Sequence, residues 1–226
     1  MEFKRVTTAQ TNYRGTRRKV SLLALVVVNL IPLAGVLFFG WDVAALMILY
    51  WSENLVLGFF TLARMLVVSP LGGCFSGLFF LIHYGGFCGV HGMFIVMTLI
   101  DGDFNPFPDD TWPLFLVFPQ ILFNVTAAVL AFAPAEWIVA FVALFVSHGV
   151  SFLVNFLLGP ERETATIGAL MGAPYGRIVI LHIAIIAGGF GVMALGQPVF
   201  MLIVLVMLKM GLDLGLHLRE HDRKAG

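Results

Sequence analysis

The sequence predicts an all-α protein, a polytopic transmembrane bundle of about seven helices. Of its 226 residues, 60% are hydrophobic and 12% are charged, whereas about a quarter of the residues in an ordinary soluble domain are charged. The segments Met65 to Ile100 and Ile178 to Leu208 contain no Asp, Glu, Lys or Arg. Each exceeds the ~20 residues that a helix needs to cross a bilayer, so both segments are typical of membrane-spanning helices.

Polar, proline and glycine residues divide the chain into seven apolar segments. The first is too long for a cleaved signal peptide and has no small-residue cleavage site, so we expect it to remain as a helix. We interpret Leu195-Gly196-Gln197-Pro198 as a tight turn, because an unbroken helix from Tyr175 to His217 would be twice the thickness of the membrane. Thr164 to Pro174 is predicted to be a loop or a short interfacial helix. The expected spans are Val20–Phe39, Val43–Val68, Phe75–Ile100, Trp112–Phe132, Trp137–Leu158, Tyr175–Leu195 and Pro198–His217.

The distribution of charge predicts the orientation of the chain. Residues 1–19 carry six basic residues against Glu2, which favours a cytoplasmic N-terminus in the cell (inner) membrane by the positive-inside rule. The loop after the third span has four aspartates and no basic residue, as expected outside. We therefore expect a basic cytoplasmic segment (1–19), one transmembrane domain (20–217) and a short tail (218–226). Seven spans would export this tail although it contains Arg219, Arg223 and Lys224, so six spans with an internal C-terminus are the alternative.

Several classes of function have no support in the sequence. The formal net charge is zero, so there is no basic surface for binding nucleic acid. The chain contains no P-loop, no dinucleotide-binding glycine motif, no serine nucleophile elbow and no H-E-x-x-H zinc motif. The expected surroundings are the lipid bilayer, and a homo-oligomer is compatible with the sequence.

Polar residues lie within most of the expected spans. An ionisable side chain at the centre of a membrane helix costs ~2.5–3.5 kcal/mol on insertion scales, so it needs a partner or a function. In the last span such residues recur every four positions, which predicts one polar stripe along the helix. The residues are Glu53 and Asn54 in the second span, His83 and His91 in the third, His148 and Asn155 in the fifth, His182 in the sixth, and Lys209, Asp213 and His217 in the seventh.

The depth of these residues predicts a metal site in the outer half of the bundle. Imidazoles and carboxylates are ligands of transition metals such as Zn, Fe and Cu, and a bound ion neutralises a carboxylate in lipid. Glu53 and Lys209 are the candidate catalytic groups, and Asn54, Asn155 and Arg177 the candidate substrate-binding groups. The structural alternative is that these side chains only tie helices together. The candidate metal ligands are His83, His91, His148, His182, Asp213 and His217.

Four motifs occur in order along the chain: Tyr50-Trp51-Ser52-Glu53-Asn54, His83-Tyr84-Gly85 followed by Val90-His91-Gly92, Ser147-His148-Gly149-Val150-Ser151-Phe152, and Pro174-Tyr175-Gly176-Arg177 followed by His182. With them the chain resembles an uncharacterised family of prokaryotic polytopic membrane proteins, defined by a domain of unknown function, from about Leu22 to His221. The resemblance implies a membrane location and no particular reaction.

Three functions follow as hypotheses. The first is a membrane metalloenzyme, a hydrolase or an oxidoreductase, which acts on a lipid or a small apolar substrate. In the second, two histidines on different helices ligate a haem iron for electron transfer. The third is a proton-coupled transporter or channel, in which the polar residues line a pathway.

Overall fold

The computed structural model describes residues 30–223, apart from the side chains of residues 136, 193 and 212–223. Every regular element in this range is a helix, which confirms the predicted all-α fold. Residues 20–29 of the first expected span and the N-terminal segment lie outside the described range. A short helix, Leu30–Phe39, precedes the labelled elements. These are α2 (Val43–Val68), α3 (Pro70–Leu99), η1 (Leu114–Leu116), α4 (Val117–Phe132), α5 (Ala135–Ser151), the π-helix η2 (Phe152–Leu157), α6 (Glu161–Thr164), α7 (Ile167–Gly172), α8 (Tyr175–Leu195) and α9 (Val199–Arg223).

Local sequence signals explain where the helices begin and end. Helices α2 and α8 have the predicted bounds. Helix α3 begins five residues before the expected Phe75, because the hydroxyl of Ser69 accepts a hydrogen bond from the backbone N–H of Gly72 and Pro70 occupies the first helical position. Gly196 has a φ of 65° at the end of α8, a left-handed conformation that glycine adopts readily. The predicted turn between the last two spans is therefore confirmed.

Five helical segments are long and apolar enough to cross a membrane, namely α2, α3, η1 with α4, the segment Trp137–Leu157, and Ile167–Val192. The last of these contains α7 and α8, which Ala173 and Pro174 separate. The helices Leu30–Phe39 and Val199–Gly211 are also apolar but shorter within the part of the chain that the structure describes. The chain is thus a membrane-embedded helical bundle.

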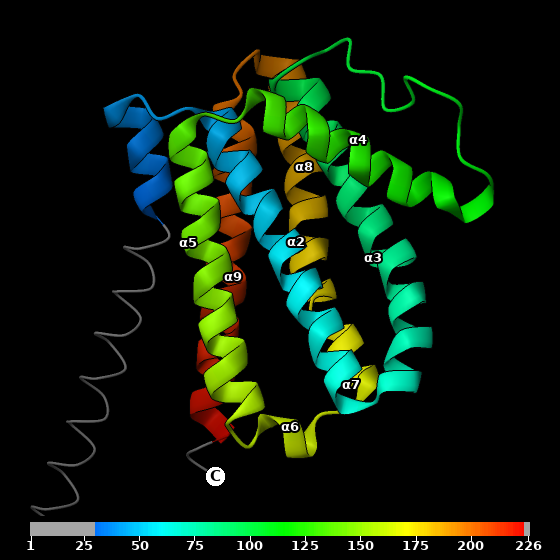
Figure 1. Cartoon of the computed structure of the whole chain (residues 1–226). Coiled ribbons are helices and arrows are strands. Elements are labelled where there is room, and N and C mark those ends of the chain that lie inside the picture. Colours follow the sequence, from blue (N-terminus) through cyan, green and yellow to red (C-terminus); the bar gives the residue numbers. More distant parts are fainter. Residues whose placement is uncertain (1–29, 224–226) are drawn as a thin grey trace, which may run out of the picture.

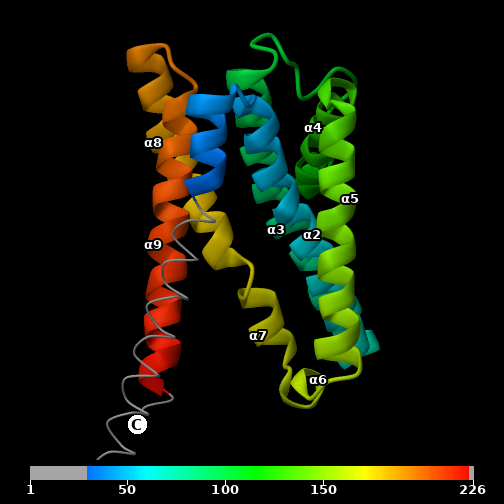
Figure 2. The same ribbon diagram turned by 90° about the vertical axis from the view of Figure 1, so that its left-hand side faces the viewer.

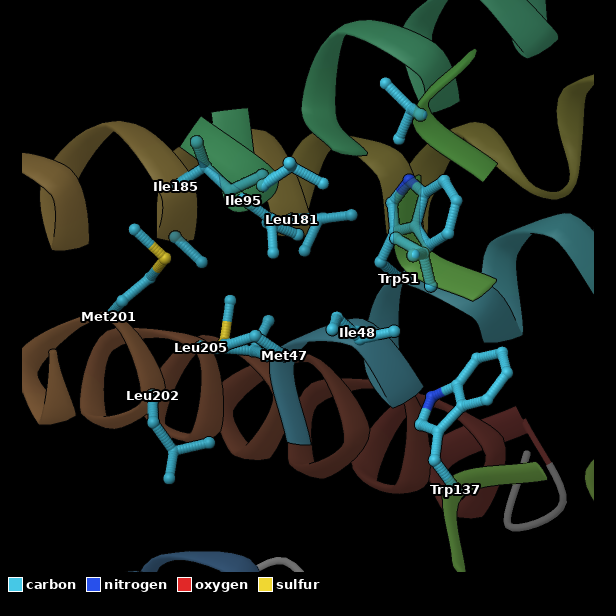
Figure 3. Packing of buried hydrophobic residues seen from close by; sticks show 14 of the residues in the cluster. Met47, Ile48, Trp51, Ile95, Trp137, Leu181, Ile185, Met201, Leu202 and Leu205 are labelled. Carbon is cyan, nitrogen blue, oxygen red and sulfur yellow. The ribbon is translucent and has the colours of Figure 1, made fainter. Parts of the chain in front are cut away.

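Helix α2 is at the centre of the bundle, where it contacts α3, α5, α7, α8 and α9. Helices α8 and α9 lie side by side as an antiparallel pair (Figures 1 and 2). The largest buried cluster is formed where α2, α3, α8 and α9 meet (Figure 3). Trp51, Ile95 and Leu181 are almost completely buried in it. The indole N–H of Trp51 donates to the backbone oxygen of Cys88 over 2.7 Å, so the central helix is joined to α3 by a buried hydrogen bond as well as by packing.

Helix α4 runs parallel to α3, its predecessor in the chain. A Cβ atom built on Gly86 would meet Phe118, one on Gly89 would meet Leu122, and one on Gly92 would meet Val125. Residue numbers therefore increase in the same direction along both helices. The connecting segment descends from the end of α3 to the start of α4 (Figure 1).

The path of α4 changes the expected number of crossings. The predicted span, Trp112–Phe132, is indeed long and apolar enough, but it starts beside the middle of α3 and ends at the top of the bundle, where α5 begins (Figure 1). The end of α3 and the start of α5 therefore lie at the same end of the bundle. Within the described residues α4 therefore adds no crossing between the two ends, which favours six spans, the alternative in which the C-terminus returns to the side of the N-terminus, over seven.

The path of α4 can be tested with single cysteines. In a chain with Cys74→Ser and Cys88→Ala, we expect Asp103→Cys, in the loop before α4, and Ala135→Cys, at the start of α5, to react with a membrane-impermeant maleimide from the same side of intact cells. A reporter fused to the C-terminus should lie on the other side. A crossing α4 would instead protect one of the two cysteines until the membrane is permeabilised.

The close contact between α3 and α4 predicts that Gly89 does not tolerate a side chain. A Cβ atom there would lie 2.9 Å from the backbone nitrogen of Leu122, and a backbone atom cannot move away as a side chain would. We expect Gly89→Ala to destabilise the protein by ~1–3 kcal/mol, measured as a lower thermal midpoint in detergent. Gly176→Ala is the matched control, because no atom lies within 4 Å of its Cβ position. An unchanged midpoint for Gly89→Ala would contradict the parallel packing.

Candidate functional site

The predicted polar residues fall into three separate groups. The first joins α2, α5 and α8 near the middle of the bundle. The guanidinium of Arg177 forms an ion pair with one carboxylate oxygen of Glu53, and Nε2 of His148 lies 3.8 Å from the other oxygen. The side chain of Glu53 is 16% exposed and that of Arg177 is 37% exposed. Because a charged group inside a membrane helix needs a partner, this group holds three helices together.

The second group consists of His83 on α3 and Tyr175 at the start of α8. Nδ1 of His83 lies 2.7 Å from the hydroxyl oxygen of Tyr175. The imidazole stacks on the ring of Phe79, with 5.2 Å between centroids and 14° between planes, and the ring of Phe87 meets it edge-on. Phenylalanines and a tyrosine therefore fix the orientation of this histidine.

The third group is a pair of histidines, His91 on α3 and His182 on α8. Nε2 of His91 lies 2.7 Å from Nδ1 of His182, a hydrogen-bond distance. His91 is only 3% exposed, and no described residue bonds its Nδ1. On α3 the second histidine follows the first by eight residues, and on α8 His182 follows Tyr175 by seven. The pairs His83–Tyr175 and His91–His182 therefore join the two parallel helices at two heights.

The other predicted residues lie outside these groups. The amide of Asn54 donates to the backbone oxygen of Tyr50 in the preceding turn of α2. The amide of Asn155, in the π-helix, donates to the hydroxyl of Ser151. The ammonium group of Lys209 lies 4.9 Å from the centroid of the Tyr50 ring, a cation–π contact. Asp213 and His217 are on α9, but their side chains lie outside the described part of the structure.

The expected metal ligands do not form one cluster in the part of the chain that the structure describes. There, no group of three or more His, Cys, Asp or Glu side chains could hold a metal ion. The four histidines of the predicted ligand set whose side chains are described are divided among the three groups. Two imidazoles on one tetrahedral ion lie ~3.4 Å apart, because each Zn–N bond is ~2.1 Å long. His91 and His182 would have to separate by ~0.7 Å to bind an ion together.

A pocket of about 530 Å³ lies between α3, α8 and the segment that contains η1 and α4. The second and third groups meet at this pocket, because His83, His91 and His182 all line it. The first group does not line it. The other lining residues are apolar side chains and one glycine: Phe79, Ile82, Gly86, Phe87, Val90, Phe115 and Phe118.

The pocket opens sideways from the bundle. Phe79 on α3 and Phe115 on η1 are 54% and 69% exposed, and both lie on the lining of the pocket. In a membrane, such outward-facing apolar residues contact lipid chains. The parallel path of α4 brings Phe115 and Phe118 to the middle of α3, so this path forms one side of the opening.

Sequence reasoning did not identify Tyr175, Phe115 or Phe118 as residues of the site. Tyr175 lies two positions before Arg177 in the Pro174-Tyr175-Gly176-Arg177 motif, and that proximity was the available signal. Phe115 and Phe118 had no such signal, because they are two of 22 phenylalanines. Their role depends on where α4 starts along α3, which apolar composition does not specify.

The ion pair of the first group predicts a specific pattern of stability. Arg177→Met leaves the Glu53 carboxylate without its partner, and an unpaired charge in a membrane is strongly unfavourable. We expect Arg177→Met and Glu53→Gln each to lower the unfolding free energy by ~1–3 kcal/mol. The double variant should lose less than the sum, as thermal unfolding in detergent will measure. Arg162→Met on α6 is the control, since this residue forms no ion pair with the described residues. Additive losses would contradict a direct interaction.

The comparisons with known proteins give a family but no activity. A family model described as a family of unknown function (DUF6498) matches residues 12–226, which is almost the whole chain. No curated protein and no solved structure shows a match. The expectation of an uncharacterised family is confirmed, and the chain belongs to the family of unknown function DUF6498.

Proposed function

We propose that the protein binds a small apolar molecule, taken from the bilayer, in the pocket lined by His83, His91 and His182. The observation that carries this proposal is the composition of the wall: three histidines among apolar side chains, around about 530 Å³. Ligand sites in proteins are commonly apolar concavities of ~300–1,000 Å³ with a few polar groups that orient the ligand. The size and the chemistry of this pocket fit that description.

The charges of the bundle favour an uncharged ligand. The nearest charged residue in sequence to Tyr175 is Arg177, which pairs with Glu53. No residue that lines the pocket is an Asp, Glu, Lys or Arg. A charged ligand would therefore enter an apolar wall without an opposite charge, which is unfavourable. A lipid-soluble molecule enters from the side without that penalty.

The histidine pair supplies the chemistry of the proposed site. Histidine is the side chain that most readily exchanges a proton near neutral pH. A pair of imidazoles at hydrogen-bond distance can move a proton between the buried ring of His91 and the exposed ring of His182. In this proposal His91 and His182 act on the ligand. Glu53, which sequence reasoning placed among the catalytic groups, positions α8 through Arg177, and Lys209 contacts Tyr50 away from the pocket.

The proposed orientation places the pocket near the middle of the bilayer, because its α3 residues, Phe79 to His91, surround the midpoint of α3. We infer a cytoplasmic N-terminus in the inner membrane from the basic residues among the first 19. With six crossings, Arg162, Arg219, Arg223 and Lys224 then share the cytoplasmic side with these residues. The acidic loop between α3 and α4 lies on the other side. The positive-inside rule is then satisfied at both termini, which an odd number of crossings does not achieve.

A metal at the His91–His182 pair is the second candidate. Its support is that two imidazoles from different helices approach within 2.7 Å beside a pocket that can hold further ligands. Elemental analysis of untagged protein tests this candidate: it predicts stoichiometric Zn, Fe or Cu in the parent protein and loss of that metal in His91→Ala.

The haem alternative has less support. Nitrogens on opposite sides of one iron would be ~4 Å apart if Fe–N bonds resemble Zn–N bonds. The transporter alternative requires a connected polar path, and no hydrogen bond between described residues joins the three groups.

Photolabelling tests ligand binding directly. We expect an uncharged fatty alcohol with a diazirine in its chain to label peptides of α3, α4 and α8 around the pocket when the full chain is illuminated in lipid nanodiscs. Val90→Trp, which adds volume at the pocket wall, should reduce this labelling at least tenfold. Val139→Trp is the matched control, because Val139 is an exposed residue of α5 outside the pocket. Equal labelling of both variants, or labelling spread evenly over the helices, would contradict the proposal.

A further inference from the structure

The hydrogen bond to Tyr175 determines which nitrogen of His83 carries the hydrogen. The hydroxyl of Tyr175 forms no other hydrogen bond to a described residue, so we assign it as the donor to Nδ1 of His83. A neutral imidazole has one N–H and one acceptor nitrogen. His83 therefore carries its hydrogen on Nε2, which is free to donate.

The same reasoning applies to the histidine pair. Nδ1 of His91 is buried and has no partner in the described structure. A buried N–H without an acceptor is rarer and less favourable than a buried lone pair without a donor. The hydrogen of His91 is thus on Nε2, from which it donates to Nδ1 of His182. His182 in turn carries its hydrogen on Nε2, on the ring edge opposite to His91.

The pocket wall consequently presents two N–H donors, Nε2 of His83 and Nε2 of His182. Both residues line the pocket, and both are exposed. Neither Nε2 atom forms a hydrogen bond to a described residue. A ligand that satisfies both donors needs two acceptor atoms, and an uncharged ligand supplies them most simply as carbonyl oxygens.

The spacing of the two donors limits the geometry of the ligand. Tyr175 marks the height of His83 on α8, and His182 lies seven residues further along, a rise of ~10.5 Å. Because the two donors lie at different heights, a single ligand reaches both only if it carries an acceptor at each of two opposite ends. Carbonyl oxygens at opposite positions of a six-membered ring meet this requirement.

The apolar wall favours a flat ring between these donors. Phe79, Phe87, Phe115 and Phe118 contribute four aromatic rings to one pocket, and aromatic rings prefer offset-stacked or edge-to-face contacts with other planar rings. An acyl chain would fill the space without using these preferences. The sideways opening gives an apolar tail a path into the bilayer.

We propose that the ligand of this pocket is a lipid-soluble para-quinone, whose two carbonyl oxygens accept hydrogen bonds from His83 and His182. This inference rests on the proposed function, because it names the class of molecule that the same pocket binds. It concerns binding and orientation of the quinone ring.

The test compares two probes with the same tail. The full-length chain in lipid nanodiscs is titrated with decyl-1,4-benzoquinone and with decylbenzene, and the thermal midpoint is followed, because a ligand that binds the folded state raises it. We expect an apparent affinity at least tenfold higher for the quinone. Equal stabilisation by the two probes would overturn the quinone assignment.

Variants separate the donor role from a packing role. His83→Phe and His182→Phe should weaken quinone binding at least tenfold, whereas His83→Gln and His182→Gln keep an N–H donor and should remain within about threefold of the parent. His148→Phe, the same substitution on α5 outside the pocket, should leave the affinity unchanged. If the Phe variants do not fold, the Gln variants and the comparison of the two probes still test whether the histidines donate hydrogen bonds to the quinone. Loss of binding in the Gln variants to the level of decylbenzene would overturn the donor role.

The failure of this inference is distinct from the failure of the proposed function. Photolabelling at α3, α4 and α8 together with equal binding of both probes would overturn the quinone alone. Absence of labelling at these helices together with no binding of either probe would overturn both proposals.

Discussion

The arrangement of the helices in this protein depends on one constraint: a polar side chain inside a membrane bundle needs a partner. Lipid supplies no hydrogen bonds, so Glu53, His83, His91 and His182 are each matched with a residue on another helix. These matches hold α8 against α2 and α3 at defined heights. Because α3 and α8 are parallel, the pairs His83–Tyr175 and His91–His182 are separated by nearly the same number of residues on both helices. The pocket lies beside these two pairs.

Much of the fold could be predicted from composition, because long apolar segments and local caps are encoded locally. Helices α2 and α8 have the predicted bounds, and the turn at Gly196 was expected. The path of α4 could not be predicted in the same way. Its apolar length fits a crossing, but its direction depends on contacts of Gly86 and Gly89 with residues more than 30 positions away.

The types of residue in the candidate site could be predicted from the sequence, but the pairs that these residues form could not. The depth argument drew attention to histidines within several membrane helices. It treated them as one ligand set, although a hydrogen-bond partner relieves the burial of an imidazole as a metal does. Which partner each ring takes depends on rotation of the helices about their axes, and the sequence does not specify this rotation to within one hydrogen bond. The metal ligand set that includes Asp213 and His217 remains a prediction.

The interruption between α7 and α8 has an electrostatic consequence for Glu53. Because Ala173 and Pro174 separate α7 from α8 and α8 begins at Tyr175, the first turn of α8 lies next to the ion pair of Arg177 with Glu53. The positive end of a helix macrodipole favours a nearby anion. A continuous helix through this region would move that partial charge to the membrane surface and leave the guanidinium as the sole source of positive potential at this carboxylate.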